Sequence, residues 1–269
     1  MLTEAVKKQA GCNAVQSYGV EFYAAMSQTT QTDTRKAADV VRLVQVSQAS
    51  NGVCYGSFGE TGVGAQELEK IVGAVPHPVA AALERKAYFF VPLALSEGEE
   101  TLIAERYSVT LGDRAACHRN YTFGGSQFVF ISTRLMDDKF SVAFEFFINV
   151  GHAFVDRAGV SEEFADLAWR QAEATVRGET SLDAYEFRKQ ATTAGGDEKA
   201  RNEYLAAAFS DTIAIYLLSL TLDFDYYDLR ERDYPLLAPA AMAERLRKLN
   251  ELFPPNKGYD FAIHYRRRT

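Results

Sequence analysis

Cysteine is scarce in this 269-residue chain, which has only three: Cys12, Cys54 and Cys117. They lie far apart and form no CxxC pair, so we expect neither a disulfide framework nor a zinc site built from thiolates. A catalytic cysteine has no local support in the sequence. The pattern favours three reduced, structural thiols in a cytosolic protein.

Clustered positive charge is also lacking. The formal net charge is −7, and the basic residues form no long run apart from the short Arg266-Arg267-Arg268 tail. Nucleic-acid binding relies on clustered Lys and Arg side chains that neutralise phosphates. We therefore do not expect nucleic acid as the partner, and the mild acidity is interpreted as a solubility feature.

Long apolar runs are missing as well. Nowhere do eighteen apolar residues follow one another, so no membrane-spanning helix and no membrane partner are expected. Residues 1–16 contain charged and polar side chains where the apolar stretch of a signal peptide would lie. We therefore expect a cytoplasmic protein. Its 47% hydrophobic and 24% charged residues are ordinary for a globular chain that buries a substantial core.

The chain is expected to divide into three parts. Residues 1–50 read as an N-terminal extension of two helices, the second beginning near Asp33-Thr34. Residues 51–64 contain five glycines without periodicity and are the best linker candidate. Residues 65–269 form the main domain. The extension could pack across a cleft, bind a partner or form a dimer contact, and a homo-oligomer is left open.

Within the main domain, strand-forming segments precede helical ones. Residues 88–95 and 128–132 are apolar and β-rich enough for strands, and residues 66–75 and 78–86 suggest short helices. From residue 139 onward the spacing of apolar residues is helical almost throughout. This order predicts an α+β fold that is mostly helical. The long helices are expected at residues 141–158, 162–177, 182–190, 199–220 and 240–252.

The helix expected around residues 140–158 has one polar stripe. It is apolar around most of its circumference, which is typical of a buried helix. Its polar exceptions follow one another at steps of four, three and four residues, which places them on a single face. Two interpretations stay open: a hydrogen-bonded network inside the core, or a functional site. The stripe consists of Glu145, Asn149, His152 and Asp156.

A second helix, around residue 203, carries a related pattern. Glu203 precedes Ser210 and Asp211 by seven and eight residues, so the three share a face. Three consecutive alanines, residues 206–208, would let another helix or a ligand approach closely. Taken alone, Glu203 is interpreted as a solvated or helix-pairing glutamate.

These two segments carry a family resemblance. Residues 146–159 resemble the zinc helix, HExGHxxDD or similar, of the lethal-factor-like metalloproteases, the family of the Pro-Pro endopeptidases. Residues 202–209, NEYLAAAF, resemble the family's downstream segment NEFFAEAF. The resemblance covers about residues 65–255. It implies a zincin-like metalloprotease fold, with a small mixed β region and extra N-terminal helices.

Compared position by position, the resemblance implies a degenerate HExxH motif. His152 matches the second zinc histidine and Glu203 matches the glutamate ligand. Ile148 stands at the first zinc histidine and has no lone pair to offer a metal. Asn149 stands at the catalytic glutamate and cannot take a proton from a metal-bound water. The next family carboxylate is Ala207 here, so we expect no zinc peptidase activity.

Three functions are considered. The first is a pseudoprotease, a pseudoenzyme that binds a peptide or protein partner in the former substrate cleft, with residues 128–132 as the strand that pairs with it. The second is an enzyme with altered chemistry, in which His152 acts as general base beside Glu145, Asp156 and Glu203. The third is a helical interaction protein. The catalytic candidates are therefore His152, Glu145 and Asn149.

No cofactor is expected, and a divalent metal is the alternative. His152 and Asp156 are four residues apart on a helix, a spacing that can chelate, and Glu203 could complete the set. Such a site could take zinc, although its oxygen ligands suit iron or manganese better. The remaining histidines are expected in surface or capping roles, although His118 could reach a cleft. They are His77, His118 and His264.

Overall fold

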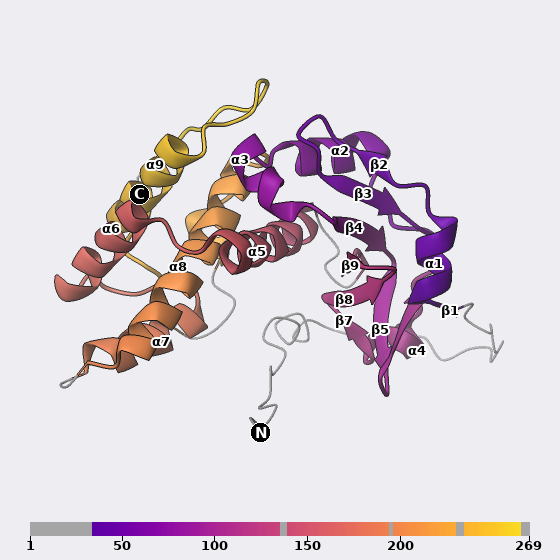
Figure 1. The fold of residues 1–269 in the computed structure, drawn as a ribbon, viewed down its shortest axis with the longest axis horizontal. Helices are drawn as coiled ribbons and strands as arrows, with labels where there is room; N and C mark the ends of the chain where they lie inside the picture. Colours follow the sequence, from indigo (N-terminus) through magenta and orange to yellow (C-terminus); the bar gives the residue numbers. More distant parts are fainter. Residues whose placement is uncertain (1–33, 135–138, 194–195, 230–233, 265–269) are drawn as a thin grey trace, which may run out of the picture.

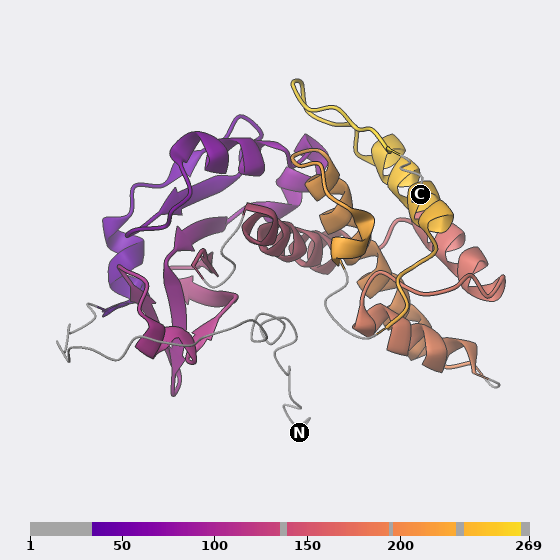
Figure 2. The ribbon, with the colours of Figure 1, turned by 180° about the vertical axis from the view of Figure 1, so that it is seen from behind.

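The computed structural model describes residues 34–134, 139–193, 196–229 and 234–264. The strands come from the first half of the chain and the long helices from the second half. In both views of the ribbon these two halves lie side by side, with one long helix, α5 (Lys139–Ala158), running between them (Figures 1 and 2). The mixed helix-and-sheet class expected from the sequence is therefore confirmed.

A five-stranded sheet faces α5. Its three inner strands run parallel, and an antiparallel strand closes each edge. Parallel strands require a crossover connection, and helices α2 (Ala65–Gly73) and α3 (His77–Ala80) lie between β3 and β4. In spatial order the strands are β2 (Ser47–Gln48), β3 (Cys54–Ser57), β4 (Lys86–Val91), β9 (Ser126–Ser132) and β8 (His118–Phe123).

A four-stranded antiparallel sheet lies beside the first. The stretch 88–95, expected as one strand, is divided at Pro92 between β4 and β5, which belong to different sheets. Proline cannot donate to a strand ladder, which explains why the strand breaks there. In spatial order the second sheet contains β1 (Thr34–Lys36), β6 (Glu100–Ala104), β5 (Leu93–Glu97) and β7 (Ala115–Ala116).

The helical half follows the sequence expectation closely. Each helix expected after residue 139 is present, with ends that shift by a few residues. Besides α5, the long helices are α6 (Glu162–Glu173), α7 (Leu182–Thr192), α8 (Glu198–Ser219) and α9 (Pro239–Leu252). The shorter ones are α1 (Ala37–Leu43), α4 (Val109–Gly112), η2 (Ala81–Leu83) and η3 (Tyr226–Leu229). No helix within the described ranges is long and apolar enough to cross a membrane.

The main core lies between the sheet and the helices. Alternate residues of β9 point to opposite faces: Val129 and Ile131 join the cluster that contains α5 and α8, whereas Phe128 and Phe130 pack on the other face with α1. Helices α5 and α8 cross in very close contact at Gly151, where an added Cβ would lie 2.4 Å from the backbone oxygen of Ser210. Glycine is therefore required at this crossing.

The N-terminal part of the described chain differs from the expectation. Residues 34–50 hold one short helix and two strands, β1 and β2, one in each sheet. Residues 51–64, expected as a linker, contain β3, which lies between β2 and β4. The first helix expected in residues 1–50 falls outside the described residues. Pairing with neighbouring strands therefore determines the structure of much of residues 34–64, where the sequence predicts a helix and a linker.

The cysteines correct another expectation. Cys117 is disulfide-bonded, whereas Cys54 is free; Cys12 lies outside the described residues. The prediction of three reduced thiols is therefore wrong at Cys117. The cytoplasmic location stays a prediction.

Candidate functional site

The four polar residues expected on one helix face all belong to α5. Glu145 and Asn149 are half-buried, and His152 and Asp156 are exposed. Ile148, between the stripe and the core, packs against the main apolar cluster. The stripe therefore runs from the half-buried middle of the helix toward its exposed C-terminal end.

Glu145 lies at the centre of a hydrogen-bonded chain between the sheet and α5. Its Oε1 is 2.6 Å from Nδ1 of His118 on strand β8. The amide Nδ2 of Asn149 donates to the same Oε1 at 3.1 Å and to the Glu145 backbone oxygen at 2.9 Å. The Glu145 side chain is only 13% exposed, so these two donors hold a carboxylate that water scarcely reaches. The sequence predicts a surface or capping role for His118, and the structure adds a hydrogen bond from this residue to Glu145 of α5.

His152 lies near a second carboxylate, that of Asp211 on α8. Burial raises the pKa of Asp211, and the His152, Ser181 and Thr180 side chains oppose that rise by favouring the ionised form. The Thr180 hydroxyl donates to Oδ2 of Asp211 at 2.8 Å. The sequence had placed Asp211 on the Glu203 face of its helix but gave no role to Thr180 or Ser181.

Glu203 is not held against the stripe. Its carboxylate pairs with Lys199, one helical turn earlier, at 3.7 Å, and its side chain is 40% exposed. Across the described residues, no three His, Cys, Asp or Glu side chains converge to hold a metal ion. The structure thus does not gather His152, Asp156 and Glu203 into one site, and metal binding stays a prediction.

A buried ionic network lies next to the Asp211 carboxylate. Arg245 donates to both carboxylate oxygens of Glu179, at 2.9 and 3.2 Å, and neither side chain is exposed. Arg188 and the Tyr204 hydroxyl also donate to Glu179, and Gln171 accepts from Arg245 Nε at 2.8 Å. Because Thr180 follows Glu179 directly, the network fixes the loop that holds the Asp211 carboxylate.

Within the described residues, strand β8 pairs with β9 alone, and its other edge has no neighbouring strand. Ser132 of β9 donates to the Cys117 oxygen, whereas Gln127 of β9 donates to Arg85 instead of β8. In an antiparallel ladder, hydrogen-bonded and non-hydrogen-bonded pairs alternate. The alternation that starts at the Cys117–Ser132 pair therefore directs every second backbone N–H and C=O of β8 away from β9. These residues are His118, Asn120 and Thr122.

The same residues carry the polar face of β8. His118 and Asn120 lie opposite Ile131 and Val129, whose side chains belong to the cluster containing α5. On the reverse face, Tyr121 packs with the aromatic residues of the smaller cluster. The polar side chains of β8 therefore lie on the face of the sheet that α5 covers. By contrast, β9, expected as the strand that pairs with a peptide, is flanked by β4 and β8 and has no open edge.

Comparisons with known proteins add no relative. No family model, no curated protein and no solved structure matches this chain.

Proposed function

We propose that this protein is a pseudoprotease that binds an extended peptide segment of a partner along strand β8. The observation that carries the proposal is the unpaired edge of β8 beside the polar stripe of α5, joined by the His118–Glu145 hydrogen bond. Adding a strand to an open sheet edge needs only backbone groups on both sides. The polar side chains around the edge would then select the peptide.

The side chains of α5 support binding rather than hydrolysis. Ile148, at the position of a zinc ligand in the lethal-factor-like metalloproteases, packs against the core. Asn149, at the position of the catalytic base, donates its amide to Glu145. Neither group can activate a water, because one is a hydrocarbon and the other lacks a basic oxygen. The zincin-like fold of residues 65–269 is part of this proposal.

The edge suits a peptide that carries hydrogen-bonding side chains. His118, Asn120 and Thr122 alternate along β8 and present a donor, an amide and a hydroxyl to the same side. A strand pairing with β8 would place every second side chain beside them. We therefore expect a preference for polar residues at alternate positions, and no binding of Pro-rich segments, which lack the required N–H groups.

A matched pair of variants tests the proposal. Peptides selected from a random display library on the full chain would be measured against Asn120→Pro and Asn120→Ala. Proline removes an N–H that points away from β9, a position where edge strands tolerate it, whereas alanine keeps the N–H. We expect Asn120→Pro to weaken binding about tenfold or more, equivalent to about 1.4 kcal/mol, and Asn120→Ala to weaken it less. Equal affinity in both variants would exclude strand pairing at this edge.

The second candidate is an enzyme with altered chemistry centred on His152. It is favoured by the Asp211 carboxylate, which interacts electrostatically with His152 and could orient it as a general base. A metal held by His152, Asp156 and Glu203 is its metal-dependent form. Metal analysis of the purified protein tests that form: one equivalent that is lost in His152→Ala would support it and contradict the pseudoprotease.

A further inference from the structure

Two charged groups border strand β8, one on each face of the sheet. Glu145 lies on the face that α5 covers, where it is hydrogen-bonded to His118 of the strand. Arg119, the next residue of β8, lies opposite Phe130, whose side chain belongs to the cluster on the reverse face. Because successive residues of a strand alternate between faces, His118 and Arg119 point in opposite directions. The two faces beside β8 therefore carry charges of opposite sign.

The Glu145 carboxylate lacks a permanent positive partner. Its side chain is only 13% exposed, and its two donors, Nδ1 of His118 and Nδ2 of Asn149, both contact Oε1. Among the described residues, no Lys or Arg forms an ion pair with Glu145, and no donor reaches its Oε2. His118 supplies a positive charge only while its ring holds a second proton. An added cation would therefore stabilise this nearly buried carboxylate.

The Arg119 guanidinium lacks an acceptor on the reverse face. Its Nε is buried and has no hydrogen-bond partner within the described ranges, and no Asp or Glu there forms an ion pair with it. Buried donors without an acceptor are rare in folded proteins because they lose their bonds to water. The two terminal nitrogens of Arg119 are not among the buried unpartnered atoms, so a carboxylate can reach the guanidinium from outside.

A strand added to the edge of β8 would bring side chains to both groups. Residues opposite one another in neighbouring strands point to the same face, with Cβ atoms about 4.5–5.5 Å apart. The peptide residue opposite His118 therefore points to the side of Glu145, and its neighbour opposite Arg119 points to the reverse face. A basic side chain at the first position would meet the carboxylate. An acidic side chain at the second would meet the guanidinium.

We propose that β8 selects a peptide segment in which a basic residue stands next to an acidic one, the basic side chain toward Glu145 and the acidic one toward Arg119. This preference rests on the proposed peptide site and names the class of peptide that it takes. Two basic neighbours would place one cation beside Arg119, and two acidic neighbours would place one anion beside Glu145. The net charge of −7 produces no such pattern, because it attracts positive charge at every position.

Peptide titrations on the full chain test the spacing of the two charges. Three peptides of identical composition, in a host of threonines and valines, carry Lys-Glu, Glu-Lys, or Lys and Glu separated by one threonine. The separated pair places both charges on one face. At about pH 8, where an ordinary imidazole is neutral, we expect one adjacent order to bind about tenfold more tightly than the separated pair. Equal affinities, or no saturable binding of any of the three, would overturn the proposal.

Two conservative variants locate each charge. Glu145→Gln removes the negative charge and keeps an oxygen for His118 and Asn149, and Arg119→Gln removes the positive charge. In Glu145→Gln, replacing the peptide Lys by Gln should cost no further affinity, because the pair is already broken. The same holds for Arg119→Gln and the peptide Glu. Losses that simply add in both cycles would show that the peptide charges do not meet these residues, and the proposal would be wrong.

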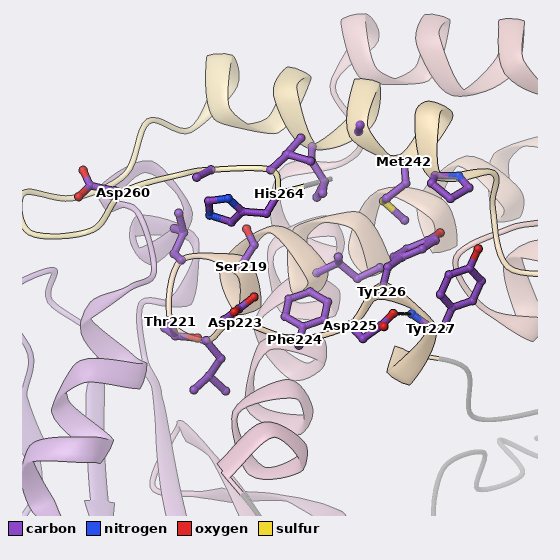
Figure 3. Close-up of a pocket in the computed structure, with 18 residues that line it drawn as sticks. Ser219, Thr221, Asp223, Phe224, Asp225, Tyr226, Tyr227, Met242, Asp260 and His264 are labelled. Carbon is purple, nitrogen blue, oxygen red and sulfur yellow. Dashed lines mark hydrogen bonds between the residues drawn. The ribbon is translucent and has the colours of Figure 1, made fainter. Parts of the chain in front are cut away.

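A cavity of about 750 Å³ in the helical half provides the control for binding elsewhere. Figure 3 shows Asp260 and His264 of the C-terminal segment along one side of it and the loop after α8 along the other. No residue of β8 or α5 lines this cavity. Ala262 is exposed and does line it, so Ala262→Trp narrows the cavity and should leave peptide binding unchanged. A loss as large as that of Glu145→Gln would place the peptide in the cavity and contradict the proposal.

Failure of the charge preference and failure of the peptide site give different results. If Asn120→Pro weakens the library-selected peptide while the spacing of Lys and Glu has no effect, β8 pairs with peptides and only the charge preference is wrong. If Asn120→Pro and Asn120→Ala bind that peptide equally, the peptide site itself is wrong and the charge preference fails with it. We expect both the loss in Asn120→Pro and the dependence on spacing.

Discussion

Arg245 is the largest fully buried side chain in the described part of the chain. Its guanidinium forms an ion pair with Glu179. Removing one partner of a buried ion pair leaves the other charged and unpaired, which costs about 3–5 kcal/mol. We therefore expect Arg245→Met to lower the free energy of unfolding by that amount.

Urea denaturation measures this loss against a control on the same helix. Arg247 is exposed on α9, and a surface arginine contributes about 0–1 kcal/mol. Arg247→Met should therefore change stability little. A loss of less than about 1 kcal/mol in Arg245→Met would contradict the buried-pair account.

Asp211 should make stability depend on pH. Burial raises its pKa above the ordinary 3.8, so the folded state binds a proton more tightly than the unfolded state. The free energy of unfolding must then fall as the pH rises from the pKa of Asp211 in the unfolded chain through its raised pKa in the folded protein. At higher pH the free energy of unfolding stays at this lower value. Asp211→Asn removes this titration while it keeps an oxygen for the Thr180 hydroxyl.

We expect Asp211→Asn to raise the melting temperature at pH 7 and to leave it nearly unchanged at pH 3. Melting curves across this range measure the difference, with the exposed Asp166→Asn as a control. A variant that is less stable than the parent at pH 7 would mean that the ionised carboxylate stabilises the fold. Stabilisation would instead indicate that Asp211 is kept for binding or catalysis.

Among the elements, the crossing of α5 and α8 depends on one glycine. Alanine is favoured over glycine inside a helix by about 1 kcal/mol, but a Cβ at residue 151 would lie 2.4 Å from the Ser210 oxygen. Because that oxygen belongs to a helix backbone, the two helices would have to separate. We expect Gly151→Ala to destabilise the protein by about 1–3 kcal/mol.

Gly112 provides the control, because nothing lies within 4 Å of an added Cβ there. Gly112→Ala should be neutral in the same denaturation experiment. If Gly151→Ala were as stable as the parent, the close helix contact would be contradicted.

The elements also differ in how well the sequence predicted them. Helices α5 to α9 have long apolar periodicity, which is the strongest local signal. Strand β3 is four residues long and lies in a glycine-rich stretch, so its pairing with β4 is set by tertiary contacts that no local pattern contains. Strand β8 is mostly polar because it is an edge strand, and it was missed for that reason.

At the scale of the whole molecule, sequence patterns predicted which residues share one face of a helix. They did not predict which residues from different parts of the chain form hydrogen bonds or ion pairs. The stripe on α5 was predicted by helical spacing, since its members lie within one helix. The partner of Glu145 is His118, 27 residues away, and the partner of Glu179 is Arg245, 66 residues away. Such pairs arise only when sheet and helices pack, so neither could be predicted from one sequence. Asp211 lies on the expected helix face, but its partner Thr180 lies in the loop between α6 and α7, which helical spacing cannot predict.

The arrangement of the two halves places the proposed peptide site along their junction. Helix α5 contributes the polar stripe and also a close contact with α8, at Gly151. The sheet contributes β8, whose polar side chains lie on the face covered by that helix and whose His118 is hydrogen-bonded to Glu145 of the stripe.

Amide hydrogen exchange, followed residue by residue by NMR, tests strand pairing at β8 most directly. Binding of a selected peptide should slow exchange at His118, Asn120 and Thr122, whose N–H groups point away from β9. Arg119 and Tyr121 already donate to β9 and should change little. Alternating protection along β8 with the peptide left intact is the predicted result. Uniform or absent protection on β8, or cleavage of the peptide, would contradict the account.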